Sequence, residues 1–197
     1  VLLTLIVCSL AGYKIQRTRS KISKITKSYM AIGQMVPFAV IMVPLSQILG
    51  KLGINNNLPG LLFVYCAMYI PMMTFVYSGY CDSISEQLDE AATIDGCNQF
   101  QLFTRIIFPM LKSCTATVTI INVMWIWNDF LLPLLMLGGR KSSKTLQLAA
   151  YSFMGQYKME WQNIMSAAIL IIIPALILYL IFQKSIIKGV VAGAVKG

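Results

Sequence analysis

Three acidic residues stand close together in the stretch DEAATIDG, at positions 89–96, although the chain has only seven acidic residues in total. The carboxylates of Asp89, Glu90 and Asp95 can accept hydrogen bonds or pair with basic groups. Ala91 and Ala92 lie between them, and small side chains let a helix backbone approach another surface closely. This combination predicts a flat contact surface with an acidic rim.

Catalytic and metal chemistry are limited by what the sequence lacks. It has no histidine, which excludes a His-based catalytic dyad or triad and a His-containing zinc site. Its five cysteines are odd in number and form no CxxC pair, so we expect small apolar core residues in a reduced compartment. A G-x-x-x-x-G-K-[ST] phosphate loop is missing, because GGRKSSK at 138–144 lacks the spacing. We therefore expect no metal, no bound cofactor and no ATP hydrolysis by the chain itself.

The composition indicates a membrane protein. Hydrophobic residues make up 57% of the 197 residues and charged residues 12%, whereas a soluble domain is about half apolar and about a quarter charged. The apolar residues fall in long uncharged runs, which is typical of membrane spans. We expect an all-α fold, a polytopic membrane helix bundle with about five spans. These spans cover about residues 1–13 (partial), 29–50, 58–80, 113–137 and 163–182.

Residues 1–13 are apolar but too few to cross a bilayer, so we expect them to be the later part of a helix that begins before residue 1. The basic residues predict the orientation of the spans. Loops 14–28, 81–112 and 183–197 share one side because spans alternate, and they carry eleven lysines and arginines against five on the opposite side. The positive-inside rule places these segments, including the C-terminus, in the cytoplasm.

The net charge of +9 is thereby assigned to membrane topology and not to nucleic-acid binding. Loop 14–28 carries six positive charges and no negative charge. Binding of anionic membrane lipid is the alternative use of these charges.

The cytoplasmic loop at residues 81–112 is expected to hold two short helices. The first would begin in a capping box of Ser83 and Glu86 and end before Gly96, which is suited to the left-handed conformation. The second would begin at Asn98, with Gln101 three positions on, and end at Pro109. The expected apolar stripes are Ile84, Leu88 and Ala91 on the first helix, and Phe100, Phe103 and Ile107 on the second.

The first of these helices could dock onto a partner protein or lie on the membrane surface. Helices that lie on a membrane surface are usually rich in lysine and arginine, and the first helix has neither. A short, capped helix with small residues at its centre and carboxylates at its edges therefore favours docking.

The stretch EAATIDGCNQFQLFTRIIFP resembles the cytoplasmic signature of permease subunits of binding-protein-dependent ABC importers, which runs E-A-A, a later glycine and a closing I-x-L-P. The matching residues are Glu90, Ala91, Ala92, Gly96, Ile106 and Pro109, and Phe108 replaces the usual leucine. WNDFLLPLL at 127–135 and the terminal KGVVAGAVKG are similar to the carbohydrate branch of that family, the maltose-type second permease. The resemblance covers essentially the whole chain.

The resemblance implies the transmembrane-domain fold of type I ABC importers, truncated at the N-terminus, in a bacterial cell membrane. The subunit would form half of the translocation pathway of a sugar importer, with an oligosaccharide as the expected cargo. Its coupling helix would insert into a cleft on a cytoplasmic ATPase dimer, which uses the ATP. Further implied partners are a second permease in a heterodimer, an extracellular or periplasmic sugar-binding protein and membrane lipid. The residues implied in coupling to the ATPase are Glu90, Ala91, Ala92, Asp95, Gly96 and Pro109.

Asp129 is the single acidic residue inside an expected span. An ionised group at the centre of a span costs about 3 kcal/mol on insertion scales, so it normally faces a cavity or a partner. With Trp125, Trp127 and Asn128 it could contact a sugar in the pathway. Alternatively, Asn128 and Asp129 could hold helices together while the tryptophans form an aromatic belt.

Two other classes of protein compete with an importer permease. An ion-coupled secondary transporter or channel subunit would need ionisable groups paired across several spans, and Asp129 alone is available. A membrane enzyme would need groups for metal or acid–base chemistry, which are scarce without histidine. The sequence therefore favours a transport subunit that is not itself an enzyme.

Overall fold

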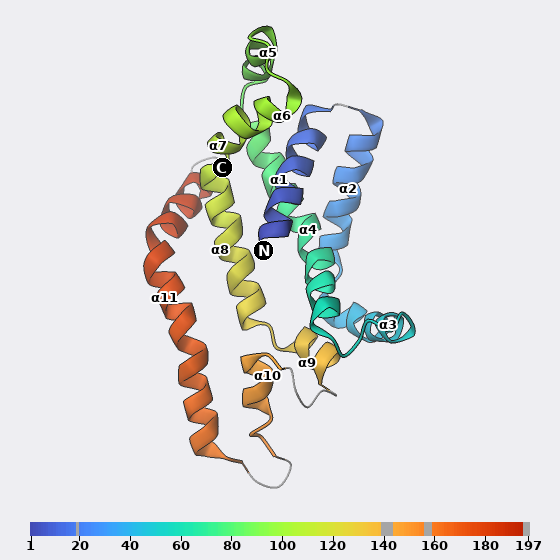
Figure 1. The fold of residues 1–197 in the computed structure, drawn as a ribbon, viewed down its shortest axis with the longest axis vertical. Coiled ribbons are helices and arrows are strands. Elements are labelled where there is room, and N and C mark those ends of the chain that lie inside the picture. The colour runs from blue at the N-terminus through green and yellow to red at the C-terminus, as the bar shows by residue number, and fades with distance from the viewer. Residues whose placement is uncertain (19, 139–143, 156–158, 195–197) are drawn as a thin grey trace. The chain divides into compact units, whose positions relative to one another are not determined.

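The computed structural model describes residues 1–18, 20–138, 144–155 and 159–194, which form helices joined by turns (Figure 1). These ranges contain no β-strand beyond one isolated bridge between Met154 and Met159. The expected all-α class is therefore confirmed. The helices are, in chain order, α1 (Leu2–Arg17), α2 (Lys21–Met35), α3 (Phe38–Lys51), α4 (Leu58–Asp82), α5 (Gln87–Ile94), α6 (Gln99–Gln101), the π-helix η1 (Leu102–Ile107), α7 (Phe108–Met110), α8 (Lys112–Asn128), α9 (Leu131–Leu137), α10 (Leu146–Tyr151) and α11 (Trp161–Ala194).

The chain divides into two compact units, which are described separately. The first unit contains residues 1–36, 66–122 and the chain from 184 on, and the second contains residues 37–65 and 123–183. The first unit has a continuous core of side chains from α1, α4, η1 and α8, whose most buried members include Cys8, Tyr77, Cys81, Leu102, Ile107, Leu111 and Cys114. Three of the five cysteines are thus buried core residues, as the sequence predicted.

Among the described residues, two helices are long and apolar enough to cross a membrane, α4 over its whole length and α11 from Trp161 to Gln183. They coincide with the expected spans 58–80 and 163–182. Two bent helix pairs, over residues 21–51 and 99–128, pass the same test if each pair counts as one span. α11 continues beyond the expected span as far as Ala194.

The expected span 29–50 is not one continuous helix. α2 ends at Met35, and Val36 and Pro37 have extended backbone, with ψ of 114° and 136°. Proline has no N–H to donate and disfavours helical geometry in the residue before it. Pro37 therefore ends one helix and starts the next, which the sequence analysis did not anticipate.

The expected span 113–137 is also interrupted. α8 ends at Asn128 and α9 begins at Leu131. Asp129 therefore lies in a gap between two helices and not in the middle of one, which corrects the expectation from the apolar run.

The loop at residues 81–112 contains two helical segments, as predicted, but the first begins later than expected. The expected capping box of Ser83 and Glu86 does not form, because the Ser83 hydroxyl donates to the Tyr80 carbonyl at 2.7 Å. α5 begins at Gln87 instead, where the backbone N–H donates to the Ser85 hydroxyl at 3.3 Å. Ser83 therefore closes the end of α4 and does not start α5.

The end of the first helix is as predicted. Gly96 has a φ of +82°, in the left-handed region that favours glycine. Its N–H donates to Thr93 O at 3.1 Å, and the Cys97 N–H donates to Ala92 O at 2.9 Å. These two bonds form a Schellman motif, which ends α5 sharply.

The second helical segment begins at the predicted capping box. The Gln101 N–H donates to Asn98 Oδ1 at 2.9 Å, and the Asn98 N–H donates to Gln101 Oε1 at 3.0 Å. The helix then widens into the π-helix η1, in which the Phe108 N–H donates to Phe103 O, five residues back. The helix ends at Met110, one residue after the predicted end at Pro109, and the chain then bends by 73° into α8, as expected for the turn toward the next span. The wide turn of η1 changes the hydrogen-bonding pattern just before Pro109. The ring of a proline clashes with a regular α-helical turn.

The expected apolar stripes are only partly buried. Ile84, Phe103 and Ile107 belong to the core, whereas Leu88, Ala91 and Phe100 are exposed. Ala92 is buried in place of Ala91. Because α5 begins three residues later than predicted, the face it turns to the core differs from the one the periodicity suggested.

Candidate functional site

The acidic stretch forms a short helix that presents one face away from its unit. α5 projects beyond the ends of α1 and α4 (Figure 1). Glu90, Ala91 and Ile94 are spaced by three and four residues, so they share one face, and all three are exposed. Asp95 and Gly96 follow on the exposed turn. The exposed face combines a carboxylate rim with a flat centre at Ala91.

The two alanines of the motif lie in different environments. Ala91 is exposed, whereas Ala92 is 4% exposed and belongs to the core cluster with Ile84, Leu102 and Phe103. Ala92 also supplies the carbonyl that accepts the Cys97 N–H in the Schellman motif. Ala92 therefore seats α5 on its own unit, and Ala91 is available to a partner.

Two large apolar residues beside the motif are exposed, and the sequence analysis missed both as surface residues. Ile94 is 86% exposed and Phe100 is 74% exposed. Exposed apolar side chains on a projecting segment are typical of interaction surfaces. In the sequence, exposure of Ile94 was indicated by its position three residues after Ala91, and exposure of Phe100 by its position inside the capping box of Asn98 and Gln101.

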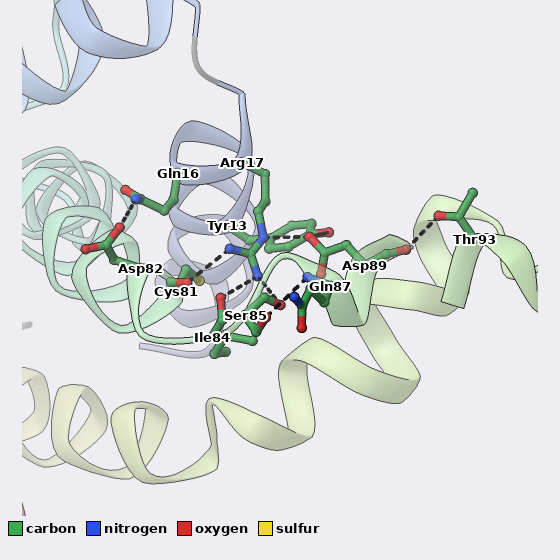
Figure 2. A network of polar contacts seen from close by, with 10 residues as sticks. All are labelled: Tyr13, Gln16, Arg17, Cys81, Asp82, Ile84, Ser85, Gln87, Asp89 and Thr93. Carbon is green, nitrogen blue, oxygen red and sulfur yellow. Dashed lines mark hydrogen bonds and ion pairs between the residues drawn. The ribbon is translucent and has the colours of Figure 1, made fainter. Parts of the chain in front are cut away.

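Arg17, the last residue of α1, binds α5 and the turn that leads to it from α4 (Figure 2). Its Nε donates to Asp89 Oδ2 at 2.5 Å, which makes an ion pair. Its Nη2 donates to the carbonyls of Ile84 at 3.0 Å and Ser85 at 3.5 Å, and its Nη1 donates to Cys81 O at 3.4 Å. We call these five residues the Arg17 network. The sequence analysis assigned Arg17 to membrane topology and Asp89 to the acidic rim.

Tyr13 and Gln16 add further contacts from α1. The Tyr13 hydroxyl donates to Asp89 Oδ2 at 3.2 Å, and its ring lies 5.6 Å from that of Phe103 between centroids. The amide of Gln16 donates to Asp82 Oδ1, and its oxygen accepts from Lys27 Nζ at 3.0 Å. The C-terminal end of α1 is therefore bonded to α2, α4 and α5.

An open pocket of about 470 Å³ lies beside the Arg17 network. It is lined by Tyr13, Lys14, Arg17, Thr18, Asp89, Glu90, Thr93, Ile94, Gln99 and Leu102. The pocket thus lies between the end of α1 and the face of α5 that carries Glu90 and Ile94, with charges of both signs at its wall. Within the described residues no group of three or more His, Cys, Asp or Glu could hold a metal ion.

The four residues considered for a sugar pathway lie in the second unit. Asp129 serves the helix that follows it, because Oδ1 accepts the N–H groups of Leu131 at 3.0 Å and Leu132 at 3.4 Å. Its other oxygen accepts from the Tyr65 hydroxyl at 2.9 Å. A carboxylate at the start of a helix satisfies N–H groups that have no partner inside the helix. Asp129 therefore performs a structural task.

The neighbouring pathway candidates make contacts of two kinds. The Trp127 indole donates to the carbonyl of Ile171 in α11 at 3.0 Å, and the Trp127 carbonyl accepts from the Gln147 amide. The Asn128 amide donates within its own helix to Met124 O at 2.8 Å and is exposed. Trp125 is 48% exposed. Trp127 thus fixes one helix to another, while Trp125 and Asn128 keep accessible surface.

Comparisons with known proteins agree with the predicted class. The profile of the family described as "Binding-protein-dependent transport system inner membrane component" matches residues 5–191. The "Multiple sugar-binding transport system permease protein MsmG" of Streptococcus mutans is 44% identical over 199 residues, which covers 100% of this chain and 72% of that protein. The "Melibiose/raffinose/stachyose import permease protein MelC" of Bacillus subtilis is 36% identical over 197 residues, covering 100% and 71%.

The fold also matches a solved structure. A chain in the "crystal structure of a bacterial ABC transporter involved in the import of the acidic polysaccharide alginate" superposes with a TM-score of 0.70 at 22% identity, covering 93% of this chain and 69% of that chain. This likeness confirms the fold of an ABC importer transmembrane domain. With the helices, the acidic loop and the family profile in agreement, the chain belongs to the inner-membrane components of binding-protein-dependent transport systems, the permease family of these importers.

Proposed function

We propose that the chain is the permease subunit of an ATP-driven sugar importer and that it docks onto a cytoplasmic ATPase through α5. The observation that carries the docking proposal is the exposed face formed by Glu90, Ala91 and Ile94 on a helix with a sharp end at Gly96. A helix of this kind inserts its flat, partly apolar face into a complementary groove. The cytoplasmic side of this loop follows from the distribution of lysine and arginine.

The groove on the ATPase should be apolar at its base and basic at its edge. Ile94 and Phe100 supply the apolar surface, and fully burying such a side chain contributes about 1.5–3 kcal/mol. Glu90 and Asp95 supply carboxylates that suit arginine or lysine at the rim. Gly96 and Pro109 contribute to docking by shaping the backbone of the loop. Ala92 contributes by packing α5 against the core of its own unit.

The remaining partners follow from the proposed role. A second permease completes the pathway in a heterodimer, and a sugar-binding protein delivers the cargo on the outer side. The ATPase binds and hydrolyses the ATP, since this chain carries no phosphate-loop sequence, and we expect the chain to bind no cofactor itself. The C-terminus lies in the cytoplasm with the acidic loop.

The proposed cargo is a sugar of the oligosaccharide class. This rests on the relatives, whose names refer to multiple sugars and to melibiose, raffinose and stachyose. For the pathway we propose Trp125 and Asn128 as residues with accessible surface, an aromatic face and an amide that suit a sugar ring. Trp127 and Asp129 would support the pathway by holding α11 and α9.

The test is co-purification of the ATPase from membranes that contain the assembled transporter. Glu90→Lys and Ile94→Glu should each reduce the amount of ATPase recovered by at least tenfold, about 1.4 kcal/mol, because they place a wrong charge on the docking face. Glu160→Lys is the matched control, since Glu160 is an exposed acid outside the loop. If both loop variants recover as much ATPase as the control, α5 is not the docking helix.

A further inference from the structure

The docking helix α5 is held to its unit at few points. It has eight residues, and turns lie on both sides of it, at 83–86 and at Gly96. An isolated helix of this length is not stable in water, so its position depends on tertiary contacts. Those contacts are of two kinds, the apolar seat at Ala92 and the polar contacts made by the Arg17 network and by Tyr13.

The two kinds of contact respond differently to a displacement of α5. Apolar contact is non-directional, so helices can slide over it with little change in buried area. Hydrogen bonds weaken steeply when their distance or angle changes. The Arg17 network therefore resists sliding in a way that the seat at Ala92 does not.

The geometry of the network connects three segments through one side chain. Asp89 is on α5, Ile84 and Ser85 are in the turn before it, and Cys81 is in the last turn of α4. Arg17 is the last residue of α1, so its side chain alone connects a displacement of α5 to the backbone of α1. Figure 2 shows the guanidinium between Asp89 and the carbonyls of the turn.

The environment makes the loss of one partner of this pair more costly than it would be in an exposed surface ion pair. The side chains of Arg17 and Asp89 are 12% and 18% exposed. The ring of Tyr13 lies 5.8 Å from the Arg17 guanidinium carbon, and its hydroxyl donates to the same carboxylate oxygen. Partly buried pairs are screened less by salt than exposed ones, and removal of one partner leaves a charge without compensation.

We infer that Arg17 is a positioning residue that passes movement of the docking helix to α1, and that its partner for this task is Asp89. This inference rests on the proposed function, because it assumes that an ATPase moves α5. It separates the three acids of the motif by role. Asp89 faces inward and transmits, while Glu90 and Asp95 face outward and dock.

Arginine is required because three different nitrogens of the guanidinium are used at once. Lysine would keep the positive charge but offers a single ammonium group without the planar fork. Arg17→Lys should therefore keep the complex assembled and still impair transmission. This separates geometry from charge.

The experiment uses the complete transporter, with its ATPase, second permease and binding protein, reconstituted in lipid vesicles. ATP hydrolysis and sugar uptake are measured in the same vesicles, together with the amount of ATPase bound per permease. Arg17→Lys and Asp89→Asn should lower the sugar transported per ATP by roughly fivefold or more, the lower end of coupling between sites. Lys14→Gln is the matched control, a cation one turn earlier on α1, and should keep the wild-type ratio.

The exchanged pair Arg17→Asp with Asp89→Arg tests the contact itself. Partial recovery of the ratio relative to either charge reversal alone is expected if the two side chains act on each other. A wild-type ratio in both Arg17→Lys and Asp89→Asn would overturn the inference, and so would a loss of bound ATPase in parallel with the loss of uptake. Failure of the wild-type permease to bind any ATPase would instead overturn the proposed function.

Discussion

Gly12 offers the sharpest test of how α1 packs on α4, the helix that leads to the docking loop. A Cβ placed on Gly12 would lie 2.6 Å from Tyr77 Cβ, 2.9 Å from Ser78 N and 3.1 Å from Thr74 O. Two of these three neighbours are backbone atoms, which cannot rotate away. The first distance is roughly 0.8 Å below the 3.4 Å at which ordinary contact begins, so Gly12→Ala forces the two helices apart.

The cost can be estimated from the geometry. Overpacking that shifts backbone costs about 1–3 kcal/mol, and the better helix propensity of alanine returns about 0.5–1 kcal/mol. The net expectation for Gly12→Ala is a loss of about 1–2 kcal/mol. The matched control is Gly79→Ala in α4, where nothing lies within 4 Å of an added Cβ, so stability should be unchanged or slightly raised.

The assay measures the fraction of detergent-purified protein that remains monodisperse after heating. The temperature at which half of the protein is lost is the midpoint. Gly12→Ala should lower the midpoint and Gly79→Ala should not. Equal midpoints for the two variants would refute the close approach of α1 and α4 at Gly12. They would also weaken the assignment of Arg17, which lies on the same helix five residues later.

Six further substitutions, at four positions, test single residues. Gly96→Ala should cost about 1 kcal/mol in stability because φ is +82°, while Gly96→Pro also removes the N–H bonded to Thr93 and should abolish sugar uptake in vesicles. Ala91→Leu should lower the recovery of the ATPase without lowering thermal stability, since Ala91 is exposed. Ala92→Leu should instead lower stability by about 1–3 kcal/mol, because Ala92 is buried. Asp129→Ala should destabilise by about 1–2 kcal/mol through the lost N–H partners of α9, measured by thermal unfolding, and Asp129→Asn by less.

Local signals in the sequence predicted much of the fold. The uncharged runs at 58–80 and 163–182 became α4 and part of α11, and the capping box of Asn98 and Gln101 formed as expected. Gly96 took the left-handed conformation. In each case the cause lies within a few residues of the effect, so a pattern in the sequence is sufficient to predict it.

The failures share a different physical origin. The π-helix before Pro109 and the late start of α5 at Gln87 depend on where neighbouring segments pack, which periodicity cannot show. Asp129 was assigned to a helix because the run around it is apolar, although a carboxylate followed by a new helix is also a capping pattern. Pro37 was the one clear local signal that the sequence analysis did not use.

The Arg17 network could not be predicted, because its members are separated by 72 positions between Arg17 and Asp89. Sequence reasoning read the basic loop as a topology signal and the acidic stretch as a docking surface, and each reading used the net charge of its own segment. In the structure Arg17 pairs with Asp89, whereas Glu90 and Asp95 are exposed, as are Lys14, Lys21 and Lys24. The net charge of a loop therefore indicates on which side of the membrane it lies. The direction in which each charged side chain points decides whether it can hold its own unit or face a partner.

If α5 docks onto the ATPase as proposed, this division of charges accounts for the acidic cluster in a chain with so few carboxylates. A docking helix must satisfy two partners, its own unit and the ATPase, and each needs directional contacts to resist sliding. Asp89 provides such a contact inward to Arg17, while Glu90 and Asp95 are left to provide it outward. Removing the inward carboxylate should impair transmission while docking persists, and removing an outward one should impair docking while the helix stays seated. Three carboxylates within seven positions thus suit a helix that must bind both its own unit and the ATPase.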